Sequence, residues 1–353
     1  MPFITSQVRK YFPAFAFFAG FIWDALTIGR AVGALDLLIL SGYLIGTVPI
    51  IWWLAKKANA QTYETALKSI NEGESWKTRL PYMLLQFLFG SLFCALFILY
   101  FKSSSHIMAI VWSVGLAVLL VANEFFETHY KRFTLTWTLF GFCTILLLNF
   151  VVPYIVGSVY AFWFFASVIA AVLITHFIKR SISPNLGHII PTYIVALVIT
   201  SAYVFDVIPP VPLVKRDIQV GTNLQKAEGK YMLEQNRAPW WVFWRATSNT
   251  IYIQPGEGVY CISAIFAPAG LKTKLYHRWQ HYDKKSGWVT TSHIGFDLSG
   301  GRNNGFRGYT VKQNVAYGDW RVAVETENER TIAIYTFDIQ PAKGELNKVI
   351  KAL

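Results

Sequence analysis

Seven long apolar stretches occupy the N-terminal part of the chain, up to about residue 206, and a more polar segment follows them. A helix needs roughly 20 apolar residues to cross a hydrocarbon core about 30 Å thick. Pro153 and Gly157 separate the fifth stretch from the sixth, because proline removes a donor and glycine relaxes the backbone. The pattern predicts transmembrane helices over Tyr11–Ile28, Ala34–Leu54, Tyr82–Phe101, Ile107–Ala122, Phe133–Val152, Val159–Ile178 and Ile189–Val207.

The period of the apolar pattern changes to two in the C-terminal segment, which is typical of β-strands that bury one face. Turn sequences such as Pro255-Gly256 and Ser299-Gly-Gly301 separate the runs. Short strands at this spacing predict an antiparallel, immunoglobulin-like β-sandwich. The expected strands are Trp240–Ala246, Thr250–Gln254, Val259–Phe266, Lys274–Tyr282, Val289–Asp297, Phe306–Asn314, Asp319–Glu325 and Thr331–Ile339.

These two patterns divide the chain into three parts. Residues 1–207 are expected to form the seven-helix transmembrane bundle and residues 231–353 the β-sandwich. Between them, residues 208–230 are read as a proline-rich linker, because the prolines at 209, 210 and 212 hold the preceding residues extended.

Composition and charge place the bundle in a bilayer and give it a direction. Hydrophobic residues make up 54% of the chain and charged residues only 15%, which is unusual for a soluble protein. With the N-terminus in the cytoplasm, eleven lysines and arginines fall in inner segments and two, Arg30 and Lys102, in outer loops. Seven crossings then deliver the C-terminal domain to the opposite face of the membrane, which in the inner membrane of a Gram-negative cell is the periplasmic face.

The net charge of +12 divides into +5 up to Val207 and +7 from Ile208 onward. A basic domain held at a membrane is expected to contact anionic lipid headgroups. Nucleic acid is not an expected partner on that side of a membrane. Cys261 is the one cysteine of the C-terminal segment, so no disulfide can form within it. We predict no cofactor and no metal.

Ionisable residues inside or beside a membrane span are costly and often functional. Asp24 lies near the outer end of the first predicted helix, Arg30 follows in the turn, and Asp36 opens the second helix. One interpretation is a carboxylate and arginine cluster that binds a proton or substrate on a transport path. The other is a salt-bridged helix hairpin at the interface, and the sequence leaves both open.

Motifs in the C-terminal segment point to a family. Tyr276-His-Arg-Trp279 is followed by Gly300-Gly-Arg302, by Gly305-Phe-Arg-Gly-Tyr309 with Lys312, and by Gly318-Asp-Trp-Arg-Val322. In this order the motifs resemble the bacterial domain of unknown function 2914 family, over about Gly258–Ile339. Family members are often fused to a multi-helix membrane region. The resemblance implies a fold and a location, and it implies no established activity.

The same motifs supply cations and aromatic rings that could form a binding site. Arginine binds carboxylate or phosphate in a bidentate manner, and aromatic planes stack on sugars or cations. The alternative is that Trp279 and Trp320 are core residues with arginines bordering the sheet. The candidate ligand-binding residues are Arg278, Trp279, Arg302, Arg307, Tyr309, Lys312 and Arg321, with His277 and Trp320 beside them.

The sequence favours a non-enzymatic accessory or scaffold protein of the membrane. Its exported domain would bind an envelope glycan, an anionic lipid headgroup or a partner membrane protein. A transporter or channel-like bundle that uses Asp24, Arg30 and Asp36 is the alternative. An intramembrane enzyme acting on a lipid-linked substrate is the third hypothesis, and it would need a convergent acid–base pair.

Overall fold

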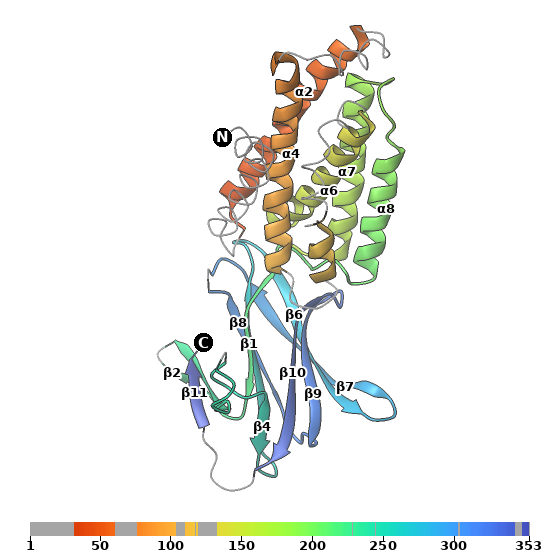
Figure 1. Ribbon diagram of the computed structural model, residues 1–353. Helices are drawn as coiled ribbons and strands as arrows, with labels where there is room; N and C mark the ends of the chain where they lie inside the picture. The colour runs from red at the N-terminus through yellow and green to blue at the C-terminus, as the bar shows by residue number, and fades with distance from the viewer. Residues whose placement is uncertain are drawn as a thin grey trace, which may run out of the picture. The chain divides into compact units, whose positions relative to one another are not determined.

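The computed structural model describes residues 32–60, 76–103, 110–116, 118, 133–227, 229–243, 245–302, 304–342 and 348–352. Contacts divide the chain into a helical unit that ends at Ile208 and a β unit that comprises Pro209–Leu353 together with short segments that include Val156–Tyr160. Figure 1 labels the elements of both units. Each unit is described by itself below.

Five helices make up most of the described part of the helical unit, and a further helical run covers 110–116. The described residues therefore hold six helical segments rather than seven. The first predicted span, Tyr11–Ile28, and half of the fourth, Ile107–Ala122, lie outside the described residues. The helices are α2 (Ala34–Ala60), α4 (Trp76–Ser103), α6 (Thr134–Val156), α7 (Ala161–Ile182) and α8 (Ile190–Val204).

Within the described part of the chain, four helices are long and apolar enough to cross a membrane, as the hydropathy pattern predicts. They cover Ala34–Ala58, Leu80–Ser103, Thr134–Val156 and Ala161–Ile182, while Ile190–Val204 is shorter. Hydroxyl side chains inside these helices bond back to the preceding turn, as Thr144 does to the Phe140 carbonyl at 2.6 Å. Such bonds satisfy the hydroxyl without a second helix, which makes it tolerable in an apolar segment.

Helix α6 is the most buried of the membrane-length helices, with 67% of its apolar window inside the protein. Trp137 is fully buried, and its indole nitrogen donates to Ser183 Oγ at 3.1 Å. A Cβ at Gly141 would stand 2.4 Å from Thr192 Cγ2 of α8 and 3.4 Å from Thr175 of α7. The absence of a side chain at Gly141 therefore lets three helices approach closely, as in many membrane bundles.

The β unit contains eleven described strands in three sheets (Figure 1). One sheet has the order β1-β5-β8, a larger one β4-β10-β9-β6-β7, and a small one β11-β3-β2. Among the described strands, all pairs are antiparallel except β4 with β10. The strands are β1 (Val214–Gly221), β2 (Leu224–Ala227), β3 (Lys230–Asn236), β4 (Thr250–Ile253), β5 (Val259–Phe266), β6 (Lys272–Asp283), β7 (Gly287–Ser299), β8 (Phe306–Lys312), β9 (Gly318–Thr326), β10 (Thr331–Pro341) and β11 (Lys348–Ala352).

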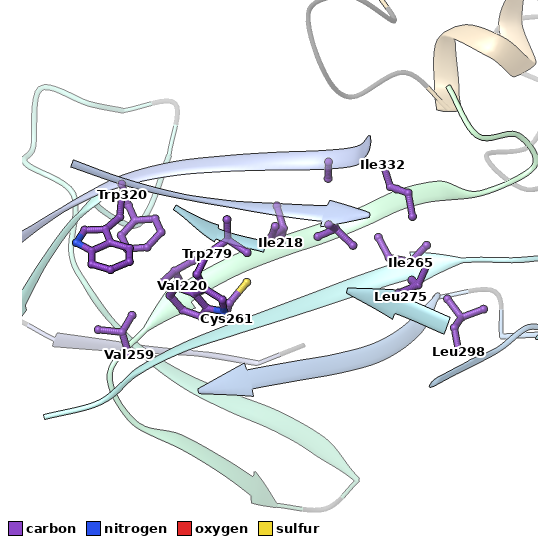
Figure 2. Packing of buried hydrophobic residues seen from close by; sticks show 14 of the residues in the cluster. Ile218, Val220, Val259, Cys261, Ile265, Leu275, Trp279, Leu298, Trp320 and Ile332 are labelled. Carbon is purple, nitrogen blue, oxygen red and sulfur yellow. The ribbon is translucent and has the colours of Figure 1, made fainter. Parts of the chain in front are cut away.

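One hydrophobic core is shared by the first two sheets. The three-stranded sheet contributes Ile218, Cys261 and Ile265, and the five-stranded sheet contributes Trp279 and Trp320 among others. Figure 2 shows these side chains gathered between the strands. Burial of large apolar side chains from both sheets is the main force that holds the unit together.

The prediction that residues 208–230 form a linker is wrong, because strands β1 and β2 lie within this range. The sequence shows no alternation of apolar and polar residues at the start of β1, because Lys215, Arg216 and Asp217 are consecutive charged residues. The register of β1 shifts between Lys215 and Asp217, which is typical of a β-bulge. Ile218 and Val220 nevertheless point into the core. The prolines stiffen only the short segment before β1.

The predicted strand Trp240–Ala246 is also wrong, because turns occupy this segment. Val242 N donates to the Pro239 carbonyl at 2.9 Å, and Arg245 N donates to the Val242 carbonyl at 3.4 Å. Two adjacent tryptophans after a proline carry no alternation, so no face of a strand is defined. The other seven predicted strands correspond to β4–β10.

Candidate functional site

Alternation along β6 sends its side chains to two different faces of the five-stranded sheet. His277 and Trp279 point into the core and are fully buried, while Arg278 between them is partly exposed. A register shift after Trp279 places Gln280 opposite Thr290 of β7. Strand β6 therefore has one face toward the core and the other on a polar surface.

A polar network inside the core links the two sheets through His277. Its Nε2 lies 2.8 Å from Ser263 Oγ of β5, and its Nδ1 lies 2.9 Å from Thr310 Oγ1 of β8. The Trp279 indole donates to the same Thr310 hydroxyl at 3.1 Å. Burial lowers the pKa of His277 to about 3, so the ring is neutral and serves as one donor and one acceptor. This network fixes the position of β6.

On the opposite face, Arg321 of β9 reaches across β6 to β7. Its Nε donates to Gln280 Oε1 at 2.7 Å, and its guanidinium carbon lies 4.5 Å from the centre of the Trp288 ring. Gln280 Nε2 in turn donates to Thr290 Oγ1 at 3.2 Å. The guanidinium is therefore oriented by an amide and stacked on an indole, an arrangement that leaves its terminal nitrogens available for an anion.

Arg278 forms an ion pair beside Arg321, on the same face of the sheet. Its guanidinium contacts the carboxylate of Glu325, which is fully buried, at 2.5 Å. His293 of β7 lies 3.9 Å from the same carboxylate and stacks on Tyr276 with ring centroids 4.4 Å apart. We call the residues Arg278, Gln280, Trp288, His293, Arg321 and Glu325 the outer-face site.

The electrostatics of the outer-face site favour a negative ligand. Arg278 and Arg321 oppose the single carboxylate of Glu325, so these three groups together carry a net positive charge. Desolvation lowers the pKa of Arg321, and the repulsion from Arg278 lowers it further, while Glu325 acts in the opposite direction. An anion bound beside Arg321 would offset that repulsion.

The predicted ligand residues do not converge on one surface. Trp279 lies in the core, so its assignment to a binding surface is wrong, and Trp320 is buried as well (Figure 2). Arg278 and Arg321 do share a face. Alternation along β8 directs Thr310 to the core, so Arg307 and Tyr309 lie on the outer side of the three-stranded sheet.

Two predicted cations lie at other places. The Arg302 guanidinium sits 5.8 Å from the Phe306 ring centre, in the glycine-rich loop before β8. Lys312 Nζ contacts Ser292 Oγ and the Thr291 carbonyl, and thereby links β8 to β7. Arg302 therefore contributes to the structure of the loop before β8, and Lys312 to the contact between β8 and β7.

The predicted membrane charge cluster is described only at Asp36, because Asp24 and Arg30 lie outside the described residues. Asp36 Oδ2 accepts a hydrogen bond from Gly33 N at 2.9 Å. A carboxylate in the first turn of a helix satisfies a free backbone donor and interacts favourably with the helix dipole. This contact gives Asp36 a structural role at the start of α2.

Sequence reasoning missed four members of the site: Gln280, Trp288, His293 and Glu325. The alternation of Arg321-Val-Ala-Val-Glu325 already places Arg321 and Glu325 on one face of their strand. The register that brings β7 beside them could not be read from that pattern. Within the residues described, no three histidine, cysteine, aspartate or glutamate side chains are placed to hold a metal ion.

Comparison with known proteins supports the family resemblance. Residues 272–339 match the family model described as "Protein of unknown function (DUF2914)", which confirms the resemblance for the C-terminal region. The matched range holds all six residues of the outer-face site. It covers less than half of the chain. No curated protein matches the sequence significantly.

Similar solved structures include three of different kinds. An immunoglobulin-like protein from Pseudomonas aeruginosa is 10% identical and covers 35% of this chain and 97% of its own, with a TM-score of 0.20. A β-glucosidase from Listeria innocua is 11% identical, covering 35% and 16%, with a TM-score of 0.19. An alkylpurine DNA glycosylase from Pseudomonas fluorescens is 10% identical, covering 86% and 97%, also with a TM-score of 0.19. At these TM-scores the likeness supports no inference about this chain.

Proposed function

We propose that this chain, with its DUF2914 region, is a non-enzymatic multi-pass membrane protein whose β unit binds an anionic ligand at the outer-face site. The observation that carries the proposal is the Arg321 guanidinium, stacked 4.5 Å over Trp288 and held by Gln280 at 2.7 Å. An arginine oriented in this way loses little freedom when it binds a carboxylate or phosphate. Arg278 adds a second positive charge next to it.

The ligand that fits the site carries a carboxylate or a phosphate. Arginine forms short, paired hydrogen bonds with either group, and these bonds are about twice as strong as neutral ones. Such groups occur in acidic envelope glycans, anionic lipid headgroups and the carboxylates of partner proteins. All three kinds of molecule carry an anionic group that arginine can bind, so the experiment must determine which of them is bound.

The proposed location is the inner membrane of a bacterial cell, with the N-terminus in the cytoplasm and the β unit in the periplasm. Eleven inner against two outer basic residues support this orientation if the chain crosses seven times. Helix α8 has only 15 residues, about 22 Å, so the proposal requires that its ends lie in the interface. We further propose that the two larger sheets form an immunoglobulin-like sandwich, which their shared core supports.

The transport alternative has less support. It requires a charge pair on a path through the bundle, and the Asp36 carboxylate caps α2 instead. The buried polar network around His277 does not suggest an enzyme either. Ser263, His277 and Thr310 are all at most 5% exposed, so a substrate could not reach them without opening the core.

The test is native mass spectrometry of the full-length protein, extracted in mild detergent, for the parent chain and for Arg321→Gln. We expect an anionic adduct on the parent protein and a several-fold loss of that adduct in Arg321→Gln. Arg307→Gln is the matched control, because it removes an equal charge from the other sheet. The adduct mass then separates a phospholipid from a glycan or a peptide.

An unchanged adduct in Arg321→Gln would overturn the binding proposal. So would an equal loss in Arg307→Gln, because that outcome indicates attraction by net charge alone. Arg321→Lys adds a stricter comparison. It keeps the charge and loses the planar fork, so retention should fall between the parent and Arg321→Gln.

A further inference from the structure

An aromatic loop projects from the β unit between β3 and β4. Trp240 is 88% exposed, Trp241 is 61% exposed and Phe243 is 89% exposed. The two tryptophan rings touch edge to face, with centroids 6.0 Å apart. Contiguous aromatic exposure of this kind marks an interaction site in a folded protein. We call the described residues 237–243 and 245–249 the aromatic loop.

The backbone of the aromatic loop is bonded at its base, so the exposure belongs to a defined conformation. Arg237 and Thr247 form a β-bridge, and Ala238 N donates to the Ala246 carbonyl at 3.0 Å. Ser248 N donates to the Asn236 carbonyl at 2.8 Å, next to the bridge. A loop closed in this way presents its tip without a large ordering cost on binding.

The charges around the tip distinguish between a lipid surface and other partners. The aromatic loop contains two arginines, Arg237 and Arg245, and no acidic residue. Both arginines are exposed. Tryptophan is enriched where a membrane meets water, and arginines close to an anionic leaflet are attracted to it. The aromatic side chains at the tip suit the membrane–water interface, and the two arginines beside them suit anionic headgroups.

A bilayer is also within reach through the covalent structure. Only the residues from Phe205 to Leu213 separate the end of α8 from the start of β1. Such a segment spans at most about 30 Å when extended. The start of β1 is therefore held near whatever membrane the helices occupy, and the aromatic loop, as part of the same unit, is confined to its neighbourhood.

We propose that the aromatic loop inserts Trp240, Trp241 and Phe243 into the interface of an anionic membrane, with Arg237 and Arg245 at the headgroups. This site is separate from the outer-face site in sequence and chemistry. It would add a reversible attachment to the permanent one that the helices provide, since a few aromatic side chains anchor only weakly.

The experiment places a nitroxide at Phe243→Cys in the full chain and measures its accessibility to oxygen and to a water-soluble nickel complex. The protein is held in nanodiscs of phosphatidylcholine with about one quarter phosphatidylglycerol, which leave both membrane faces open to solvent. The three native cysteines are buried and so should label poorly. Ser286→Cys, at the exposed turn between β6 and β7, is the matched control.

The expected result is a several-fold higher ratio of oxygen to nickel accessibility at position 243 than at position 286. Trp240→Ser with Trp241→Ser should return the probe at 243 to water. Equal accessibility at the two positions would overturn the proposal. Retention of the probe in lipid after both tryptophans are removed would also overturn it, because the nitroxide itself would then be the anchor. Nitroxide broadening that disappears on dilution with unlabelled protein would point to a second copy instead.

Discussion

His277 and Ser263 belong to different sheets, and their side chains lie 2.8 Å apart inside the core. A histidine in this position must be neutral, and its pKa is lowered to about 3 by burial. The unfolded chain would protonate the same ring near pH 6.5. Folding stability therefore depends on pH through this one residue.

We predict that the β unit loses stability as the pH falls from about 6.5 toward 3, because the unfolded state then binds a proton that the folded state excludes. The expected slope is about 1.4 kcal/mol per pH unit within this window. Hydrogen exchange of β5 and β6 peptides at increasing urea concentrations measures it. His277→Gln should be less stable at pH 7 and should have a shallower slope. A parent slope equal to that of the variant would contradict the assignment.

A second prediction concerns the ion pair between Arg278 and Glu325. Arg278→Met removes the cation that contacts a fully buried carboxylate and should destabilise the β unit by about 3 kcal/mol. The double change Arg278→Met with Glu325→Leu should recover most of this loss, because no buried charge remains. Urea midpoints of the single and double variants provide the measurement. Equal midpoints for the two would show that removing the carboxylate recovers nothing, which would contradict the prediction.

The stacking of Arg321 on Trp288 gives a third prediction. Trp288→Ala should lower anion retention several-fold, because the guanidinium loses a contact worth about 0.5–2 kcal/mol and is no longer held in place. Trp288→Phe keeps a ring and should retain an intermediate amount. Native mass spectrometry of the full chain compares the two. Ile350→Ala removes an exposed apolar side chain from β11, outside both proposed sites, and should leave retention unchanged.

The helical unit offers a fourth prediction at Gly141. Gly141→Ala places a methyl group within 2.4 Å of Thr192 Cγ2 and should cost about 1–3 kcal/mol of bundle stability. Adding Thr192→Ser removes that methyl and keeps the hydroxyl that donates to the Trp137 carbonyl at 3.3 Å. Thermal unfolding in detergent should therefore show recovery in the double variant. No recovery would mean that the cost arises within α6 itself.

The alternation of apolar and polar residues predicted strands β4 to β10, and most of the predicted ends lie within about two residues of the observed ones. This succeeded because each of these strands buries one face against the other sheet. It failed for β1, where a shift in register interrupts the pattern, and for β2, β3 and β11, which form a small sheet with little core of its own. The apolar helices were predictable because their length alone meets the membrane requirement.

The site was less predictable than the fold. Residue type pointed correctly to Arg278 and Arg321, but it grouped them with Trp279, which the same alternation sends to the core. The contact between Arg321 and Trp288 bridges strands that are not neighbours in the sheet, so it depends on the tilt and length of a side chain crossing β6. No local pattern in the sequence records such a contact.

The parallel pairing of β4 with β10 joins Thr250 to Asp338, two positions far apart along the chain. A ribosome must therefore synthesise almost the whole β unit before its larger sheet can close. Until then, the edge of β4 is an unprotected template for foreign strands. The yield of folded protein should accordingly rise with slow synthesis and with chaperones that bind nascent chains.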